Sequence, residues 1–306
     1  MDIFLTLLVK LLPIYFVMAA GFGLARMTGN IAGNLAILQI YLVAPIVVFT
    51  NVMILEPTRA MAVSAILMFL ICCAISTVVY FLTKNRKDGT GPVLAQSAGT
   101  GNTGYLGVPV AIAVFTDHIL PAYLLIMVAT VIYESTLGYY FIARGKFSPR
   151  EALLKLSRLP MVYATALGLL FASQHWDIPE TWHNAARDFR GFYVISGALI
   201  IGISLAQVKK WSFDGSFFGT ILGVKFIVWP LVALAALFLE AQFIGIIPPE
   251  HKSIILLMSL LPLAANTAAF AALFNIHPDK AATAIAISTL IATVTLPVCA
   301  IILGLV

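Results

Sequence analysis

Two long apolar stretches of the sequence are each interrupted by an Asn-Thr pair among small residues. The first interruption, at 99–109, reads GTGNTGYLGVP, and the second, at 262–269, reads PLAANTAA. Amide and hydroxyl groups donate hydrogen bonds without carrying a charge. Such donors suit a carboxylate, and they hold it less firmly than a lysine or an arginine would, so the anion can be released again. The paired motifs therefore predict a binding site for an organic anion.

The residues around the pairs predict irregular backbone. Pro109 and Pro262 each lack an N–H donor and kink a helix, while Gly101, Gly104 and Gly107 permit conformations that other residues avoid. After each break we expect a new half-helix, whose N-terminus carries unpaired N–H groups and about half a positive charge. The predicted pocket is donor-rich and uncharged. The side chains expected to line it are those of Asn102, Thr103, Asn266 and Thr267.

The composition is that of a membrane protein. Hydrophobic residues make up 61% of the chain and charged residues 10%, with a mean hydropathy of +1.02, whereas about a quarter of the residues in a soluble domain are charged. Apolar runs of about 20 residues, long enough to cross a bilayer, recur from end to end. The sequence predicts an all-α polytopic membrane protein. Its ten transmembrane helices are expected at 3–25, 34–53, 60–82, 92–114, 119–142, 160–175, 190–207, 216–238, 253–274 and 280–305.

Both Asn-Thr pairs lie deep in their predicted spans. At a rise of 1.5 Å per residue, Asn102 (about ten residues into the fourth span) and Asn266 (about thirteen into the ninth) reach the neighbourhood of the midplane. Unwound backbone is tolerated there only where protein or a water-filled cavity satisfies its polar groups. Two matched breaks, one in each half of the chain, indicate a transporter's substrate site. For either motif alone, the alternative is a simple packing kink.

The loops between spans alternate in basic charge, and this alternation predicts orientation. The richer set of loops holds Arg26, Lys84, Arg86, Lys87, Arg144, Lys146, Arg150, Lys155, Arg158, Lys209, Lys210 and Lys280. The poorer set holds only Arg59, Arg187, Arg190 and Lys252. Because lysine and arginine are enriched in cytoplasmic loops, we expect both termini to lie outside. The net charge of +5 is explained by these loops, so it does not indicate a nucleic-acid partner.

An odd number of spans precedes the central loop, and this predicts an inverted repeat. The domains expected are a first five-helix repeat at 1–142, a cytoplasmic linker at 143–159 and a second, inverted five-helix repeat at 160–306. The fourth span then enters the membrane from the cytoplasm and the ninth from outside. Their breaks, aligned at the two asparagines, are expected to cross head to head at the midplane.

Three charged residues, Lys10, Glu134 and Lys225, fall inside predicted spans and away from the span ends. Intramembrane charges are functional candidates by default, although Lys10 is close enough to the outer end of its span to reach the interface. Glu134 and Lys225 are expected either to form a structural pair or to serve ion coupling, with Glu134 carrying a proton. Tyr105 and Ser135 lie near the expected cavity and are substrate-contact candidates, with packing as the alternative.

No sequence pattern indicates a cofactor or a metal. The string GTGNTG at 99–104 satisfies the dinucleotide fingerprint, but no strand precedes it and no βαβ unit follows. The three cysteines, at 72, 73 and 299, have the spacing of neither a disulfide framework nor a zinc site. Motifs of membrane-embedded hydrolases are also missing from the sequence. We therefore expect no cofactor, no metal and no enzymatic activity.

The segment NTGYLGVP at 102–109 resembles the Asn-Thr-x-x-x-Gly-x-Pro signature of the auxin efflux carrier family, and Pro262 with NIHPD at 275–279 resembles the family's ninth span and following loop. The short central loop is similar to that of the bacterial branch, which is related to plant PIN proteins and to malonate and other organic-acid permeases. The resemblance implies two inverted repeats, crossed helices four and nine, a homodimer, and a transport domain that moves like an elevator against a scaffold. It also implies that Asn102 and Asn266 contact the substrate carboxylate.

The leading hypothesis is a secondary carrier of small organic anions in a bacterial cytoplasmic membrane, with both termini on the periplasmic side. A proton- or sodium-coupled cation antiporter on the same plan is the alternative. That function would place a carboxylate at the breaks, and Glu134 is the residue that keeps it open. Malonate, another dicarboxylate, a monocarboxylate and an aromatic acid would all suit a site made of neutral donors.

Overall fold

The computed structural model describes residues 2–28, 32–54, 58–116, 118–174, 176–206 and 214–302, and within these ranges the chain is helical, without strands. Lys209 and Lys210, which contributed to the predicted orientation, lie outside the described residues, as do the side chains of Lys10 and Lys155.

The helices follow one another with short connections. Residues 2–143 form α1 (Asp2–Thr28), α2 (Ala32–Leu38), the π-helical segment η1 (Gln39–Val43), α3 (Ala44–Met53), α4 (Arg59–Thr83), α5 (Gly91–Ala98), α6 (Gly107–Val114), α7 (Leu120–Tyr133), the π-helical segment η2 (Glu134–Gly138) and α8 (Tyr139–Ala143). Residues 149–302 form α9 (Pro149–Leu156), α10 (Pro160–Ser173), α11 (Glu180–Ala206), α12 (Gly215–Gly223), the π-helical segment η3 (Val224–Val228), α13 (Trp229–Phe243), α14 (Pro249–Leu260), α15 (Asn266–Phe274) and α16 (Pro278–Ile302).

Local chemistry explains several helix boundaries. The Thr58 side chain caps α4 by accepting from the Met61 N–H at 3.2 Å. Ser148 and Glu151 bond each other's backbone N–H across the start of α9, which is a capping box. This short helix lies in the segment predicted as the cytoplasmic linker. At the end of α15, Asn275 adopts a left-handed conformation with φ 49°, and this conformation stops the helix.

Four described helical stretches are long and apolar enough to cross a membrane. They are Arg59–Thr83, Leu120–Ala143, Gly215–Phe243 and Pro278–Cys299, and shorter apolar stretches lie at Leu12–Thr28, Tyr41–Met53 and Pro160–Ser173. The four correspond to the third, fifth, eighth and tenth predicted spans, while the other spans stay predictions. Many large apolar side chains on these stretches face outward, which fits contact with lipid. Phe16, Leu82 and Phe238, for example, are 76%, 78% and 63% exposed.

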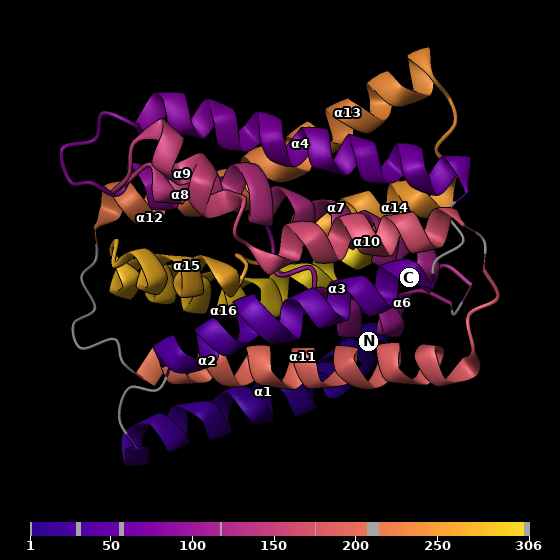
Figure 1. Ribbon diagram of the computed structural model, residues 1–306, viewed down its shortest axis with the longest axis horizontal. Coiled ribbons are helices and arrows are strands. Elements are labelled where there is room, and N and C mark those ends of the chain that lie inside the picture. Colours follow the sequence, from indigo (N-terminus) through magenta and orange to yellow (C-terminus); the bar gives the residue numbers. More distant parts are fainter. Residues whose placement is uncertain are drawn as a thin grey trace.

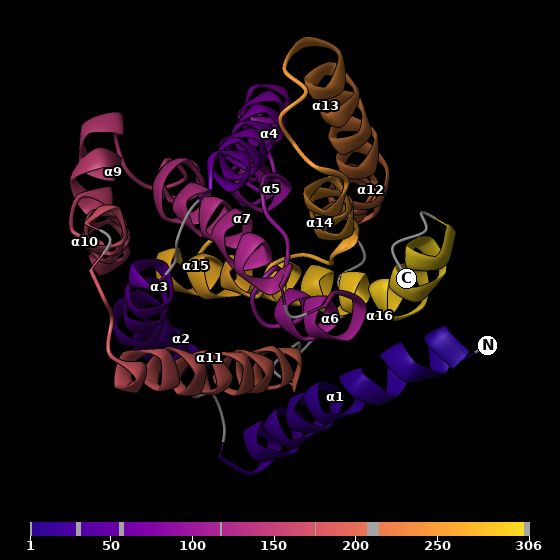
Figure 2. The ribbon, with the colours of Figure 1, turned by 90° about the vertical axis from the view of Figure 1, so that its right-hand side faces the viewer.

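The long helices lie in two groups. Figure 1 shows α4 and α13 along one side of the molecule, α1 and α11 along the other, and α15 and α16 between them. After a quarter turn, α1, α2, α3, α10 and α11 still lie together, apart from α4, α5, α12, α13 and α14 (Figure 2). Within the first group α1 packs along α11 and α3 along α10. Within the second group α4 packs against α5, and it also packs against α7.

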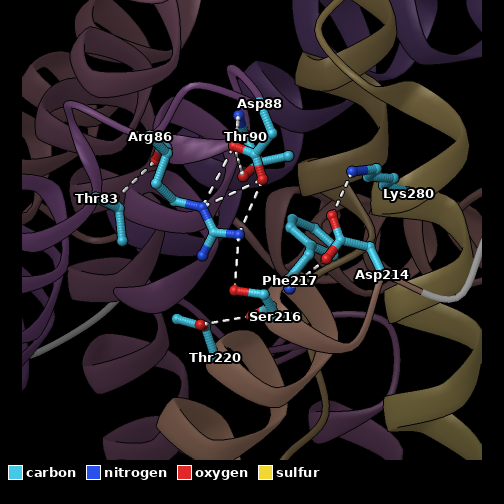
Figure 3. Close-up of polar contacts among 10 residues, drawn as sticks. Thr83, Arg86, Asp88, Thr90, Asp214, Ser216, Phe217, Thr220 and Lys280 are labelled. Carbon is cyan, nitrogen blue, oxygen red and sulfur yellow. Dashed lines mark hydrogen bonds and ion pairs between the residues drawn. The ribbon is translucent and has the colours of Figure 1, made fainter.

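A polar cluster, which we call the junction, joins the loop between α4 and α5 to the first turns of α12 and α16 (Figure 3). In the loop, Arg86 Nη2 lies 2.9 Å from Asp88 Oδ2 and donates to Ser216 Oγ at 3.1 Å. At the helix starts, Lys280 Nζ lies 2.7 Å from Asp214 Oδ2, and Asp214 Oδ1 caps α12 by accepting from the Phe217 N–H at 3.1 Å. These contacts place the loop between α4 and α5 and the starts of α12 and α16 on one face of the molecule.

The junction carboxylates are held by cations. Hydrogen bonds from the Arg86 guanidinium, together with those from Thr90, hold the pKa of Asp88 well below its usual range. The same contact raises the pKa of Arg86. The bond from Lys280 lowers the pKa of Asp214. Both acids are therefore ionised at neutral pH.

Candidate functional site

The two predicted breaks exist, and they touch. Helix α5 ends at Ala98 and α6 begins at Gly107, while α14 ends at Leu260 and α15 begins at Asn266. We call the intervening segments, 99–106 and 261–265, the paired breaks. The Asn102 N–H donates to the Pro262 carbonyl at 2.8 Å, so the backbone of one break satisfies that of the other. This is how irregular backbone can be accommodated deep in a membrane protein.

Asn102 organises the first break. Its side-chain Oδ1 accepts from the Leu106 N–H at 3.1 Å, and its carbonyl accepts from the Gly107 N–H at 2.8 Å. Its Nδ2 has no hydrogen-bond partner among the described residues. Gly107 is required by close approach, since a Cβ there would overlap the Tyr123 hydroxyl and the Leu261 side chain. Pro109 is the third residue of α6, where a missing N–H costs little because it has no intrahelical partner.

The half-helix N-termini hold fewer unpaired donors than the sequence predicts. In α15 the Thr267 and Ala268 N–H groups donate to the carbonyls of Ala264 and Ala265, each at 3.1 Å. In the first break the Leu106 and Gly107 N–H groups are used by Asn102, as described above. The physical reason is that tight turns satisfy the orphan groups locally. The donors open to a ligand are therefore mainly side chains.

Both the nitrogen and the oxygen of the Asn266 side-chain amide form hydrogen bonds. Its Nδ2 donates to Glu134 Oε2 at 2.7 Å, and its Oδ1 accepts from the Tyr105 hydroxyl at 3.3 Å. Tyr105 in turn accepts from Gln39 Nε2 at 2.9 Å, and its ring packs against that of Tyr193 with centroids 4.4 Å apart. Asn266 thus connects the second break to η2, to the first break and, through Tyr105, to η1.

Glu134 and Lys225 both form a hydrogen bond with the same residue, Thr100. Glu134 is 5% exposed, and its second oxygen accepts from the Thr100 hydroxyl. Lys225, 1% exposed, donates from Nζ to the Thr100 carbonyl at 3.4 Å and lies 4.5 Å above the ring of Trp229. Among the described residues no ion pair joins the two charges. A Cβ at Gly101 would lie 2.8 Å from Lys225 Nζ, so this glycine makes room for the ammonium group.

The paired breaks enclose a small cavity of about 20 Å³, room for roughly one or two water molecules. It is lined by the predicted residues Gly101, Asn102, Thr103, Gly104, Tyr105, Glu134 and Asn266, together with Ala44, Val47, Val48, Met127, Val131, Tyr193, Ala264 and Ala265. The pocket was predicted to be uncharged, and Glu134 makes that prediction wrong in this respect. The Glu134 carboxylate lines the cavity because η2, in the fifth predicted span, packs against both breaks. No local sequence pattern reveals this contact.

Two predicted substrate contacts lie outside this lining. Thr267 is fully buried, and its hydroxyl has no hydrogen-bond partner among the described residues. Ser135 is 6% exposed and donates to the Val131 carbonyl at 2.8 Å, within its own helix. Thr103 lines the cavity, and its hydroxyl lies 2.8 Å from that of Thr130. The functional role of every predicted site residue stays a prediction.

Sequence reasoning missed several polar residues around the cavity. Gln39 begins η1 and is 2% exposed, Thr100 is fully buried, and the Tyr193 ring closes one wall. The signal that could have found Gln39 is an amide inside an otherwise apolar run, since a buried polar group needs a partner. Two π-helical segments begin at polar residues of this network, η1 at Gln39, which bonds the cavity-lining Tyr105, and η2 at Glu134, which lines the cavity itself. π-helical turns occur frequently at functional sites.

A helical chain with several long apolar helices that expose large apolar side chains, and with a polar cavity between two broken helices, is a multi-pass membrane protein. A family model described as "Membrane transport protein" matches residues 6–300. The chain therefore belongs to this family, the auxin efflux carrier family, and the resemblance seen in the sequence is confirmed. The chain is also 26% identical, over 305 residues and 94% of each chain, to an uncharacterized transporter of Methanocaldococcus jannaschii. These findings support a membrane transporter.

Proposed function

We propose that the protein is a secondary transporter of small organic anions, mono- or dicarboxylates. One observation carries the proposal: a buried cavity lies between two broken helices and is lined by Asn102, Thr103 and Asn266. These side chains offer amide and hydroxyl donors, and among the residues that the structure describes no lysine or arginine lines the cavity. Neutral donors recognise a carboxylate while still allowing its release, which a carrier requires.

The architecture that fits this function is two inverted five-helix repeats, 1–142 and 160–306, joined by the segment 143–159. The packing of the first helix group supports it. The contact of α1 with α11 joins the first and seventh predicted spans, and the contact of α3 with α10 joins the second and sixth. In the proposed repeats, spans one and two correspond to spans six and seven. Exchanging each span for its counterpart converts the contact of spans one and seven into that of spans six and two. We assign these four spans to a scaffold and the remaining six to a transport domain.

An elevator-like movement of the transport domain provides alternating access. The cavity is too small for a mono- or dicarboxylate, so its walls must part for the substrate to enter. The cavity draws on both groups of spans, since Val47, Val48 and Tyr193 belong to the scaffold spans and Asn102, Glu134 and Asn266 to the others. Sliding one group against the other would open it. Pro109, Pro262 and Gly107 are the proposed hinge positions at the paired breaks.

The orientation, the location and the assembly are parts of the same proposal. The junction supports one element of it, because Arg86, Asp214 and Lys280 lie on one face, as the predicted cytoplasmic loops should. Both termini are then periplasmic in a bacterial cytoplasmic membrane. A homodimer that presents the scaffolds to each other would leave the transport domains free to move.

A proton- or sodium-coupled cation antiporter is the second candidate. Glu134 favours it, because a carboxylate lines the cavity. Its oxygens accept hydrogen bonds from Thr100 and Asn266, and among the described lining residues there is no second carboxylate, whereas a hard cation takes several oxygen ligands. The organic anion is therefore the better candidate substrate.

Ligand-induced thermal stabilisation of the purified full-length protein tests the proposal, because a ligand that binds the folded state raises its unfolding temperature. The probes are the sodium salts of malonate, succinate, L-lactate and indole-3-acetate, with sodium chloride and potassium chloride as references. We expect at least one carboxylate to stabilise the protein beyond the chlorides. Stabilisation by sodium or potassium alone would favour the antiporter, and the organic-anion proposal would then be abandoned.

A variant of Asn102 tests whether the anion binds at the paired breaks. Asn102→Ala should weaken carboxylate binding by about 10- to 100-fold, since a hydrogen bond to a charged group contributes about 1.5–3 kcal/mol. Asn51→Ala is the matched control, because Asn51 is an equally buried asparagine that bonds the Val47 carbonyl within α3 and does not line the cavity. Equal carboxylate binding by both variants would mean that Asn102 does not contact the anion and that the binding site lies elsewhere.

A further inference from the structure

We propose that Glu134 couples substrate binding to proton uptake: an organic anion binds at Asn266 only when Glu134 has taken up a proton. This inference rests on the proposed transport of organic anions and names its energetic coupling. It starts from the fact that the cavity built of neutral donors already contains a carboxylate of the protein itself, bonded through Oε2 to Asn266 Nδ2 at 2.7 Å.

A substrate carboxylate would share a nitrogen with Glu134. The amide of Asn266 has two hydrogens, and one is used by Glu134 Oε2. A substrate oxygen that accepts the other hydrogen would lie within about 6 Å of Glu134 Oε2, because both oxygens are within hydrogen-bond distance of one nitrogen. Two carboxylates that share a buried site do not both stay ionised at neutral pH, so one of them takes up a proton.

The groups that contact Glu134 leave its charge without a fixed counterion. Its hydrogen-bond donors are the neutral Thr100 hydroxyl and Asn266 amide. The titratable or charged groups that face it from the surrounding elements are Cys72 on α4, Tyr105 in the first break, Tyr133 at the end of α7, Tyr193 on α11 and Lys225 on η3. Lys225 is the cation of this set, and its ammonium group bonds the Thr100 carbonyl and covers Trp229 instead of pairing with Glu134.

Protonation turns Glu134 from a competitor into a donor. A neutral carboxyl group has one O–H, which can donate to a substrate carboxylate in a short, charge-assisted hydrogen bond. The step is balanced: one proton joins the Glu134 carboxylate, one organic anion binds, and both leave together. A monocarboxylate would then cross the membrane without net charge. Because linkage is reciprocal, the proton strengthens anion binding by the same factor by which the anion strengthens proton binding.

Proton uptake on binding is the direct test. Calorimetric titration of the full-length protein with malonate, succinate, L-lactate and indole-3-acetate, each in two buffers of different ionisation enthalpy, counts the protons taken up. Between pH 7 and 8.5 these ligands are themselves ionised. We expect the wild-type protein to take up close to one proton per anion and to lose about tenfold in affinity per pH unit on the alkaline side. An uptake of zero at every pH at which an anion binds would overturn the proposal, and this result needs no variant.

Two variants assign the proton to Glu134. E134Q is expected to bind the same carboxylate with no proton uptake and with an affinity that does not change over this pH range. The matched control is E240Q, because Glu240 is a second buried carboxylate, 3% exposed, which accepts from the Ile246 and Ile247 N–H groups and does not line the cavity. It should keep the wild-type uptake. Uptake by E134Q equal to that of wild type would overturn the assignment.

The failure of the coupling and the failure of the proposed function are distinguishable. If neither the wild-type protein nor E134Q binds any of the four carboxylates over this pH range, the organic-anion function is wrong, and the coupling is wrong with it. If both bind with the same pH dependence, the function stands and the role of Glu134 is wrong.

Discussion

Carboxylates at two depths of the molecule are held in opposite ways. At the junction, Asp88 and Asp214 lie 2.9 Å and 2.7 Å from the cationic nitrogens of Arg86 and Lys280, and their side chains are 33% and 24% exposed. At the paired breaks, Glu134 is 5% exposed and bonds only neutral donors among the described residues. The first arrangement fixes a negative charge, whereas the second leaves the charge able to change.

The difference separates a structural contact from a functional one. A surface ion pair contributes little to stability, about 0–1 kcal/mol, and it stays ionised over the working range of pH. A buried carboxylate without a counterion is costly to keep charged, so it responds to a proton or to a second charge nearby. We therefore expect substitutions at the paired breaks to change binding and its pH dependence, and substitutions at the junction to change stability slightly and nothing else.

The largest effect is expected for Asn266→Ala, which removes the amide shared by Glu134 and the proposed substrate. Binding of a carboxylate should weaken by about 10- to 100-fold, the loss of a hydrogen bond to a charged group. In the E134Q background the loss should be larger, because in wild type the same substitution also makes Glu134 easier to protonate and so offsets part of the cost. Binding titrations of the two single variants and the double variant measure this coupling.

The junction supplies the control for that cycle. Residues in direct contact couple by about 0.5–3 kcal/mol, whereas distant ones add within about 0.5 kcal/mol. Asn266→Ala and Asp88→Asn share no partner, so their effects should add. Additive behaviour of Asn266→Ala with E134Q would contradict the hydrogen bond between these two side chains as a determinant of binding.

The paired breaks illustrate what a sequence can predict. The interruptions at 99–109 and 262–269 were recognisable because proline and glycine act locally, on the very residues that contain them. Their contact, from the Asn102 N–H to the Pro262 carbonyl, follows once the breaks are placed at matching depth. Membership of the family was recognisable from the same motifs. The existence of the breaks was therefore predictable to within a few residues.

The partners of Glu134 show what the sequence could not predict. Lys225 was one expected partner, because both charges fall inside predicted spans, but Glu134 instead contacts Thr100 and Asn266, which lie 34 and 132 positions away along the chain. Such contacts depend on how helices pack, not on the period of any one helix. Gln39 was missed for the same reason, because its importance comes from its bond to Tyr105 in another element.

A smaller effect is expected for Tyr105→Phe, which removes one neutral donor from the cavity and keeps the ring against Tyr193. The hydroxyl donates to Asn266 Oδ1 at 3.3 Å and accepts from Gln39 Nε2 at 2.9 Å. An ordinary hydrogen bond contributes about 0.5–1.5 kcal/mol, so carboxylate binding should weaken by about 2- to 10-fold. Proton uptake per bound anion should not change, since Glu134 remains.

The matched control is Tyr80→Phe, because Tyr80 stacks on Phe141 with centroids 4.5 Å apart and does not line the cavity. Binding titrations of the two variants should differ by the factor given above. Equal binding would show that Tyr105 only packs, which was the alternative interpretation of this residue.

The smallest effect is expected for Asp88→Asn, which removes the ion pair with Arg86 but leaves an oxygen to accept from the Thr90 N–H and hydroxyl. Stability should fall by at most about 1 kcal/mol, and carboxylate binding should not change. The pKa of Asp88 is lowered in the folded protein, so its contribution is fully present above the unfolded-state pKa of about 3.9. It is lost only as the pH falls through the lower folded-state value. Thermal unfolding of wild type and variant should therefore differ by a constant amount from pH 8 to pH 5. A difference that changes within this range would mean that the junction also titrates there, and the contrast with Glu134 would no longer hold.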